Sequence, residues 1–321
     1  MPLPVAENVP LQVTGAPQRL DQFLVEHWPE PIGRRPLAAL LASADVRVNG
    51  RRATKSTRVQ AGDEVLVRLA PTAPRPVVDA TLPLVHESPT LIAVDKPPAM
   101  PSTEGRSAAP SVAALLVDRY PEMAGLDTPR SGGLVHRLDT GTSGLLLAAR
   151  NADTHAALRQ AFRARSVGKH YVAFVRGRLT HARSIEQPLR RHPRSRGRML
   201  PGRSGQRRTW PATTRVRPLH SADDVSLVHL SMQTGVTHQL RAHLALIGHP
   251  VLGDRRYRST EAPPLTARLE ARLAPSWHFL HAAAITLELP GSPDRLQTTI
   301  PSHWRRLLAD LEWSLEIADL T

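Results

Sequence analysis

The chain has 321 residues, enough for two domains, and 41% hydrophobic with 22% charged residues is typical of a globular protein with a buried core. It contains no cysteine, which excludes disulfide scaffolds, thiolate zinc sites, iron–sulfur clusters and cysteine nucleophiles. The formal net charge is +14, and all but three of the 42 Lys and Arg residues are arginines, so nucleic acid is the expected kind of partner.

The N-terminus predicts neither export nor membrane insertion. Residues 1–17 lack the basic start and apolar centre of a secretory signal, and they contain several prolines. No uncharged apolar run in the chain reaches the ~18 residues of a membrane-spanning helix. We therefore expect a cytoplasmic protein whose residues 1–17 form a flexible lead-in.

Residues 18–69 have the pattern of a small α+β module. Apolar residues at helical spacing predict helices over 20–27 and 37–41, and alternation predicts strands over 46–48 and 64–69. The pair Asn49-Gly50 after the first of these strands is typical of a tight hairpin turn.

Within this module the pieces RLD (19–21), VRVNG (46–50) and GDEV (62–65) follow one another in an order that resembles the S-four-type RNA-binding domain. The resemblance implies that arginines of the module bind RNA, and the candidates are Arg34, Arg35, Arg51 and Arg52. The alternative is that these arginines only solvate a small domain.

Residues 70–80 contain Pro71, Pro74 and Pro76, which predict a stiff, extended linker and a domain boundary. The rest of the chain, residues 81–321, would form the second domain. Its predicted strands cover 91–94, 145–149, 170–177 and 281–289, and its predicted helices cover 152–165, 238–247 and 304–317. Because strands and helices do not alternate regularly, the pattern favours an α+β fold with a mixed, mostly antiparallel central sheet and flanking helices and loops.

Familiar cofactor and metal motifs are missing from the sequence. There is no GxGxxG after a strand, no Walker loop, no HExxH and no GxSxG nucleophile elbow. His238, His243 and His249 are five and six residues apart, so they do not share one helix face as metal ligands at i and i+4 do. We expect no cofactor and no metal.

The segment 132–144 is the strongest candidate for chemistry. Glycines bracket a short polar stretch before a buried strand, which would hold Asp139 at the rim of a sheet and let a ligand approach closely. Asp139 is a candidate nucleophile or base, and Arg137 is a candidate phosphate contact. The alternative is an aspartate whose carboxylate accepts backbone N–H bonds in a tight turn.

Three segments in this half of the chain resemble, in order, the motifs of the RluA-type pseudouridine synthases. They are VHRLDTGTSGLLLAAR (135–150), KHYVAFVRG (169–177) and TGVTHQLRAHL (234–244). With the N-terminal module, the resemblance covers residues 18 to about 290 and implies the catalytic fold of that family. It identifies Asp139 as the essential carboxylate, with Tyr171 and Arg241 as its catalytic companions.

The resemblance implies an RNA pseudouridine synthase that flips a uridine out of folded RNA and isomerises it without a cofactor. Ribosomal RNA, in particular that of the large subunit, is the favoured substrate, transfer RNA is left open, and we expect a monomer. Arg137 would occupy the place of the flipped base, with His136 beside it. Leu240 would line the pocket, although core packing explains it equally well. Whether Asp139 attacks covalently or abstracts a ribose proton is left open.

One departure from the family pattern keeps other functions under consideration. The third motif usually reads GRTHQ, and here Val236 stands in place of its arginine. A non-catalytic RNA-binding or ribosome-assembly protein on a synthase scaffold is therefore the alternative. A metal-dependent hydrolase acting on RNA is a weaker one, because no ligand cluster is evident.

Residues 190–217 contain ten arginines and no acidic residue. Their prolines and glycines predict a mobile basic loop or a hairpin. We expect it to grip phosphates beside the site through residues such as Arg191 and Arg198. A disordered surface segment is the alternative.

Overall fold

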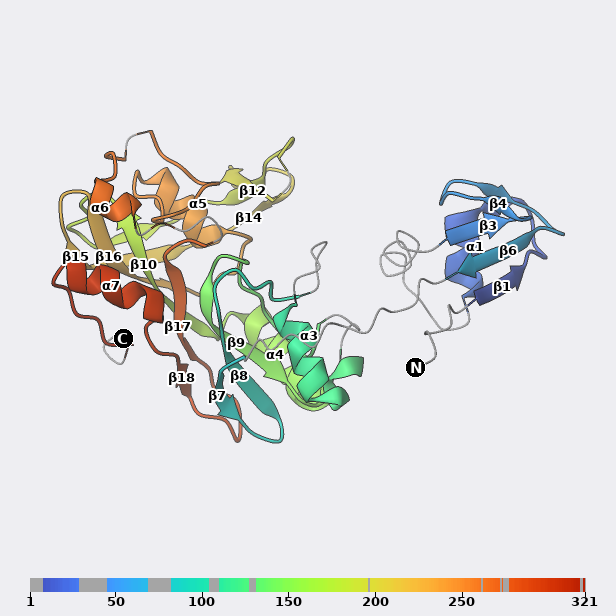
Figure 1. The fold of residues 1–321 in the computed structure, drawn as a ribbon, viewed down its shortest axis with the longest axis horizontal. Helices are drawn as coiled ribbons and strands as arrows, with labels where there is room; N and C mark the ends of the chain where they lie inside the picture. Colours follow the sequence, from blue (N-terminus) through green and yellow to red (C-terminus); the bar gives the residue numbers. More distant parts are fainter. Residues whose placement is uncertain are drawn as a thin grey trace. The chain divides into compact units, whose positions relative to one another are not determined.

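The structure is a computed structural model that describes residues 8–28, 45–68, 82–103, 110–126, 131–195, 197–260, 262–271, 273, 277–317 and 320. The chain divides into two compact units, Met1–Asp79 and Ala80–Thr321, each of which is described by itself (Figure 1). Among the described residues, no helix has the length and apolar character needed to cross a membrane.

The described residues of the N-terminal unit form one helix and two small sheets. Four strands pair antiparallel in the order β1–β6–β3–β4, and β2 pairs with β5. The elements are β1 (Asn8–Gln12), β2 (Gln18–Arg19), α1 (Leu20–His27), β3 (Asp45–Val48), β4 (Arg51–Arg52), β5 (Arg58–Val59) and β6 (Glu64–Arg68). Phe23 and Leu24 of α1 share one buried core with Val65 and Val67 of β6, so helix and sheet stabilise each other.

Strand β1 (Asn8–Gln12) corrects the expectation of a flexible lead-in over residues 1–17, of which residues 1–7 lie outside the described part. Val9 and Leu11 alternate along it and pack on the core of the unit, while the strand pairs with β6 at the edge of the sheet. An edge strand tolerates Pro10, because one side of such a strand needs no N–H donors. The helix expected over 37–41 and the linker at 70–80 lie outside the described residues.

The C-terminal unit is built on a nine-stranded sheet in the order β11–β15–β16–β10–β17–β9–β8–β7, with β18 also pairing to β17. Strands β17 and β9 run parallel, and the other described pairings in the sheet are antiparallel. The strands are β7 (Leu84–Glu87), β8 (Leu91–Lys96), β9 (Ser143–Ala149), β10 (Gly168–Arg176), β11 (Arg183–Ile185), β15 (Thr214–Ser221), β16 (Val225–Met232), β17 (Leu280–Thr286) and β18 (Arg295–Gln297). This mixed, mostly antiparallel sheet confirms the predicted α+β fold.

Helices cover both faces of this sheet (Figure 1). They are α3 (Val112–Arg119), the 3-10 helix η1 (Pro121–Gly125), α4 (Ala152–Ala164), α5 (Gln239–Leu246), α6 (Ala267–Glu270) and α7 (Ser302–Asp310). Side chains of β10 alternate between the two faces: Tyr171 and Ala173 pack in the core with α3 and α5, and Val172 and Phe174 pack in the core with α7.

The basic segment after β11 forms a sheet of its own. Strands β12 (Leu189–Arg191), β13 (Met199–Pro201) and β14 (Thr209–Trp210) pair antiparallel in the order β13–β12–β14. A small core that includes Leu189, Met199, Ala242 and Tyr257 fastens this sheet to α5. Of the two predicted forms, the segment therefore takes the hairpin.

The C-terminal helix is shorter than predicted. Helix α7 ends at Asp310, whereas the apolar spacing predicts a helix to residue 317. Glu312 has a positive φ of 58°, a left-handed conformation that a helix cannot continue through. Ile317 and Leu320 still pack in the core beside Trp304, so the apolar pattern reflects burial of an irregular tail.

Candidate active site

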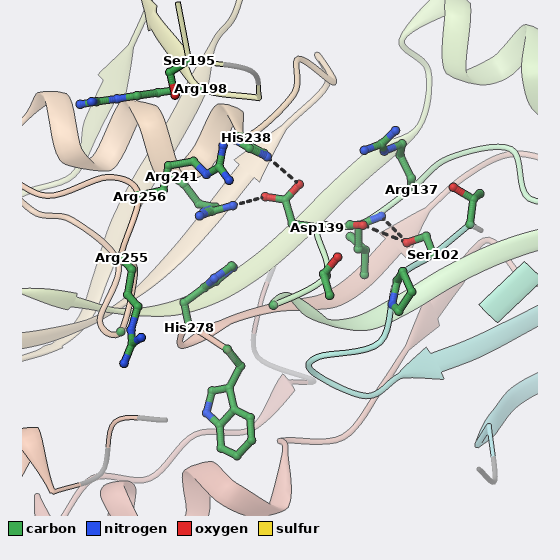
Figure 2. A pocket seen from close by; sticks show the side chains of 17 residues that line it. Ser102, Arg137, Asp139, Ser195, Arg198, His238, Arg241, Arg255, Arg256 and His278 are labelled. Atoms are coloured by element: carbon green, nitrogen blue, oxygen red, sulfur yellow. Dashed lines mark hydrogen bonds and ion pairs between the residues drawn. The ribbon is translucent and has the colours of Figure 1, made fainter. Parts of the chain in front are cut away.

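Asp139 lies in the loop that leads into β9. The backbone N–H of Thr142 donates to the Asp139 carbonyl at 3.0 Å, so the predicted tight turn is present. The Asp139 carboxylate, however, points away from the turn toward Arg241, whose Nη1 donates to Oδ2 at 2.7 Å (Figure 2). Since the carboxylate pairs with a side chain that is distant in sequence, the turn alone does not explain why an aspartate occupies this position.

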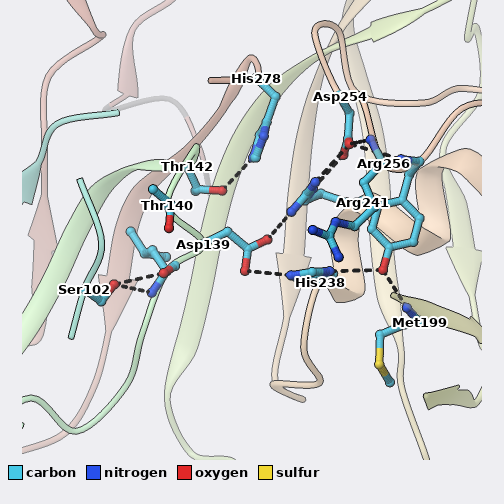
Figure 3. Close-up of polar contacts among 12 residues, drawn as sticks. Ser102, Asp139, Thr140, Thr142, Met199, His238, Arg241, Asp254, Arg256 and His278 are labelled. Atoms are coloured by element: carbon cyan, nitrogen blue, oxygen red, sulfur yellow. Dashed lines mark hydrogen bonds and ion pairs between the residues drawn. The ribbon is translucent and has the colours of Figure 1, made fainter. Parts of the chain in front are cut away.

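Several buried contacts hold the loop in place. Ser102 binds Leu138 twice, accepting from its N–H at 3.0 Å and donating to its carbonyl at 2.9 Å. Lys96, which is fully buried, donates to the carbonyls of Pro97, Met100 and Thr140. On the far side, Thr142 contacts His278 Nε2 at 2.8 Å (Figure 3). The position of Asp139 is therefore set by its neighbours on both sides.

Gly144, just after this loop, allows β9 to approach β17 closely at the centre of the sheet. It has a φ of +111°, and a Cβ atom there would clash with the backbone of Ala282 in β17. A glycine is thus required where the parallel strands β9 and β17 approach most closely.

Arg241 of α5 links Asp139 to a second carboxylate. Its Nε and Nη2 bind Asp254 at 2.5 and 2.9 Å, while Nη1 binds Asp139 (Figure 3). Burial alone would lower the pKa of this guanidinium, but the hydrogen bonds and charge of Asp254 and the charge of Asp139 raise it. Burial raises the pKa of Asp254, and its hydrogen bonds with Arg241 outweigh this and lower it. Arg241 therefore stays charged and compensates both carboxylates.

His238 faces the other oxygen of Asp139. Its Nε2 lies 3.6 Å from Oδ1, and its Nδ1 lies 3.1 Å from the Tyr257 hydroxyl, which accepts the Met199 N–H at 2.7 Å. Burial lowers the pKa of His238, so the ring has one proton near neutral pH. Because a carboxylate only accepts and the Tyr257 proton is free to be donated to Nδ1, the ring proton belongs on Nε2, facing Asp139.

Tyr171 lies on the sheet in the same row as Gly144. Across the three strands Tyr171 of β10 pairs with Ala282 of β17, and Ala282 pairs with Gly144 of β9. Burial and the nearby charge of Asp139 raise the pKa of Tyr171, so the phenol is neutral at physiological pH.

Two hollows meet at Asp139, and we call them the uridine hollow, after the substrate that the sequence resemblance implies, and the arginine hollow. The uridine hollow also contains Tyr171, Arg137 and Trp210 in its lining. The arginine hollow contains Arg198, Arg241, Arg255 and Arg256 (Figure 2). Among the described residues Asp139 is the one acidic side chain lining either hollow. Both hollows are thus suited to a polyanion.

The structure brings together most of the predicted site residues. Arg137 is exposed and lines both hollows, and Arg191 and Arg198 line one each. His136 lines the uridine hollow, but its ring accepts the Leu147 N–H at 2.9 Å and stacks on Phe162, so it supports the wall.

Leu240 corrects the expectation of a pocket wall. It is buried in the central core and lines neither hollow, because its position on α5 faces the sheet. In the N-terminal unit Arg51 and Arg52 are exposed on β4, and Arg34 and Arg35 lie outside the described residues.

The sequence did not indicate Asp254, Tyr257 or Trp210 as residues of the site. Asp254 and Tyr257 belong to one turn, in which the Tyr257 N–H donates to the Asp254 carboxylate at 3.1 Å. An aspartate three residues before a tyrosine is too common to indicate this. Trp210 had a usable signal, because it is the one aromatic residue within the arginine-rich segment 190–217.

No group of three or more potential metal-ligating side chains occurs within the described part of the chain. His243 illustrates why, since its two ring nitrogens contact Thr214 and the Gln187 carbonyl. Most of the histidine rings in the described residues form hydrogen bonds with other groups of the chain.

The chain is similar to several known proteins. The family described as RNA pseudouridylate synthase matches residues 90–246. The chain is 32% identical to ribosomal large subunit pseudouridine synthase D of Nitrosomonas europaea, over 90% of this chain and 83% of that protein. It is 30% identical to the protein of the same name from Vibrio parahaemolyticus, over 88% and 87%.

A solved structure, human RNA pseudouridylate synthase domain containing 4, is similar with a TM-score of 0.58 and 25% identity, covering 73% of this chain and 94% of that one. The shared fold and the long span over which the relatives match lead to one assignment. The chain belongs to the RluA-type family of RNA pseudouridine synthases, which are isomerases.

Proposed function

We propose that this enzyme isomerises a uridine of large-subunit ribosomal RNA to pseudouridine, with Asp139 as the catalytic carboxylate. The observation that carries the proposal is the Asp139–Arg241 pair at 2.7 Å, located where two basic hollows meet. The choice of ribosomal RNA is supported by the names of the relatives from Nitrosomonas europaea and Vibrio parahaemolyticus.

The reaction needs only the groups that this site supplies. The bond between uracil N1 and ribose C1′ breaks, the base turns, and a new bond joins C1′ to C5. C5 loses its proton and N1 gains one, so substrate and product contain the same atoms and no oxidant or reductant takes part. The site must therefore bind, orient and exchange protons, which charged and hydrogen-bonding side chains can do.

Asp139 has two chemical routes in this geometry. As a nucleophile it attacks C1′ and forms a covalent intermediate, and as a base it removes the proton from C2′. In both routes Arg241 compensates its charge and fixes one oxygen, which leaves Oδ1 on the side of His238. Deuterium at C2′ separates the routes, because only proton abstraction slows the single-turnover rate of the labelled RNA.

Tyr171 is positioned to hold the flipped base. Its neutral ring lines the uridine hollow together with Asp139, and an aromatic ring offers a face on which a flat pyrimidine can stack. Flipping costs a few kcal/mol. The exposed Arg137, two residues before Asp139, is the side chain best placed to fill the gap that the uridine leaves in the RNA.

The alternative of a non-catalytic RNA-binding protein is not favoured by the geometry. Val236 lines the uridine hollow, and it takes part in none of the contacts that join Asp139, Arg241 and Asp254. We assign its effect to RNA affinity.

The decisive experiment maps pseudouridines in total RNA from cells with and without the gene. We expect at least one site in large-subunit ribosomal RNA to disappear on deletion and to return with the wild-type gene but not with Asp139→Asn. Sites lost only from transfer RNA would contradict the substrate, and an unchanged map would contradict the activity.

The N-terminal module at 18–69 is proposed to raise RNA affinity without taking part in the chemistry. Arg51 and Arg52 are exposed on β4, and the unit of Met1–Asp79 is compact by itself. Removing residues 1–79 should weaken binding to structured RNA and flatten its salt dependence, because fewer phosphates are neutralised. The single-turnover rate at saturating enzyme, measured on a substrate with an unpaired uridine, should persist. A collapsed rate with equal binding would move part of the active site into this unit.

A further inference from the structure

Trp210 is an unusual residue for a protein surface. Its side chain is 38% exposed, and with Leu246 it is one of two large hydrophobic side chains that are exposed in the described part of the chain. It lies in β14, opposite Leu189 of β12, yet it is not part of the small core to which Leu189 belongs. Packing therefore does not explain why a tryptophan occupies this position.

The surroundings of Trp210 indicate what its ring could bind. The Arg191 guanidinium lies over the ring, 5.8 Å from its centre. Both side chains line the uridine hollow, the same hollow that Asp139 and Tyr171 line. The cationic residues in that lining are Arg137, Arg159, Arg163, Arg165, Lys169 and Arg191. An aromatic face among cations is the combination that binds single-stranded nucleic acid through stacking and phosphate contacts.

Trp210 is also held in a fixed place relative to Asp139. The sheet that contains it is fastened to α5 through the core of Leu189, Met199 and Ala242, and through the bond from the Met199 N–H to Tyr257. Tyr257 in turn contacts His238, which faces Asp139. A base stacked on Trp210 would therefore stand at a defined position from the reacting uridine.

We propose that Trp210, with Arg191 across its ring, is a second base-binding subsite, which stacks the base of a nucleotide adjacent to the uridine held by Tyr171. The inference rests on the proposed function, since it assumes that an RNA strand occupies the uridine hollow. It assigns to this chain a contact outside the reacting nucleotide, which would select RNA in which the neighbour of the target is unpaired.

Fluorescence tests the stacking directly. The chain has five tryptophans, so the difference in emission between the full-length protein and its Trp210→Phe variant reports Trp210. The probes are an octameric oligouridylate and inorganic polyphosphate with the same number of phosphates. Stacking predicts that oligouridylate quenches the difference signal and polyphosphate does not. Equal quenching by both, or by neither, would overturn the proposal.

Binding measurements give the size of the effect. Trp210→Ala should raise the Kd for oligouridylate by about 5- to 150-fold, the range that corresponds to loss of one base–aromatic stack. Trp210→Phe keeps a ring and should lose less. Leu246→Ala is the matched control, because it removes the other exposed apolar side chain and lies outside both hollows. A Trp210→Ala variant that binds like Leu246→Ala would contradict the subsite.

Kinetics separate this proposal from the proposed function. On the RNA found by pseudouridine mapping, Trp210→Ala should raise KM and leave kcat unchanged, because stacking is equal in the ground and transition states. RNAs that each lack one base beside the target uridine locate the stacked base. Wild type should bind one of these RNAs more weakly than the intact RNA, whereas Trp210→Ala should bind both equally. If wild type makes no pseudouridine, the proposed function fails. If it does and no such position exists, only the Trp210 subsite fails.

Discussion

Side chains at the floor of the site and at its rim differ in how they are held. The floor consists of Asp139, His238, Arg241 and Asp254, whose side chains are at most 18% exposed and contact one another. The rim consists of Arg137, Arg163, Arg165 and Arg191, which are exposed and line the uridine hollow. Groups fixed by buried hydrogen bonds are pre-organised for chemistry, whereas exposed cations can adapt to phosphates. We therefore expect floor variants to change the reaction rate and rim variants to change RNA affinity.

The largest effect is expected for Asp139→Asn. The amide keeps the shape of the side chain but has neither the charge nor the nucleophilicity, so kcat should fall by at least about 10⁴-fold. RNA affinity should stay close to that of wild type, because the rim is intact. Single-turnover rates and filter-binding measure the two quantities. Substantial turnover in the variant would show that the floor is not centred on Asp139.

Arg241→Lys is expected to reduce the single-turnover rate by about 10²-fold. Lysine keeps the charge but cannot bridge two carboxylates with a planar fork, so Asp139 would shift from its position. Arg255→Lys, the same change in the arginine hollow, is the control and should leave the rate nearly unchanged. If both variants lost the same share of the single-turnover rate, the arginine hollow would need arginines in general. Arg241 would then have no special place in the floor.

Variants of the rim should change how strongly RNA binding depends on salt. The double variant Arg163→Ala/Arg165→Ala removes two exposed cations of the uridine hollow and should lower the slope of log Kd against log salt by about 1.4, or about 0.7 for each phosphate contact with single-stranded RNA. Arg305→Ala/Arg306→Ala on α7 removes the same charge outside both hollows. If both double variants change the slope equally, net charge and not the rim determines RNA binding.

A smaller effect is expected in the dependence of stability on pH. Burial lowers the pKa of His278, which contacts Thr142 beside the floor, from 6.5 to about 4. The unfolded chain therefore takes up a proton below pH 6.5 that the native chain takes up only near pH 4, so stability falls as the pH falls through this window. The contribution is at most about 1.4 kcal/mol per pH unit.

Replacing His278 by Gln should remove this contribution to the slope of the free energy of unfolding against pH. Urea unfolding at pH 7, 6 and 5 measures it, and an exposed histidine such as His181 is the control. A variant with the wild-type slope would show that His278 is not kept neutral by the fold around Thr142.

How far the sequence predicts this molecule depends on the kind of contact. Local patterns predicted α1, α4, α5 and the central strands, because apolar periodicity follows directly from burial on one face. The resemblance to a known family singled out Asp139, Tyr171 and Arg241, and the structure brings Asp139 and Arg241 together across 102 residues. Composition alone would not have paired them.

The failures have physical reasons of three kinds. Prolines in residues 1–17 hid the alternation of β1, since an edge strand tolerates them. Leu240 and Arg241 are neighbours in sequence, but on α5 they point in different directions, so adjacency to a site residue did not indicate a pocket wall. Asp254 and Tyr257 act through contacts that form only after the chain has folded, and no local sequence pattern indicates these contacts.

The parallel pair β9–β17 has a consequence for the order in which a growing chain can become active. Ser143 contacts His281 and Thr142 contacts His278, across 138 and 136 residues, and β17 lies between β9 and β10 in the sheet. A ribosome must therefore have synthesised the chain through β17 before the Asp139 loop has its full set of neighbours. The N-terminal sheet closes between β1 and β6, and the last residue of that pairing is Arg68. During synthesis the module at the N-terminus can thus be complete long before the isomerase exists.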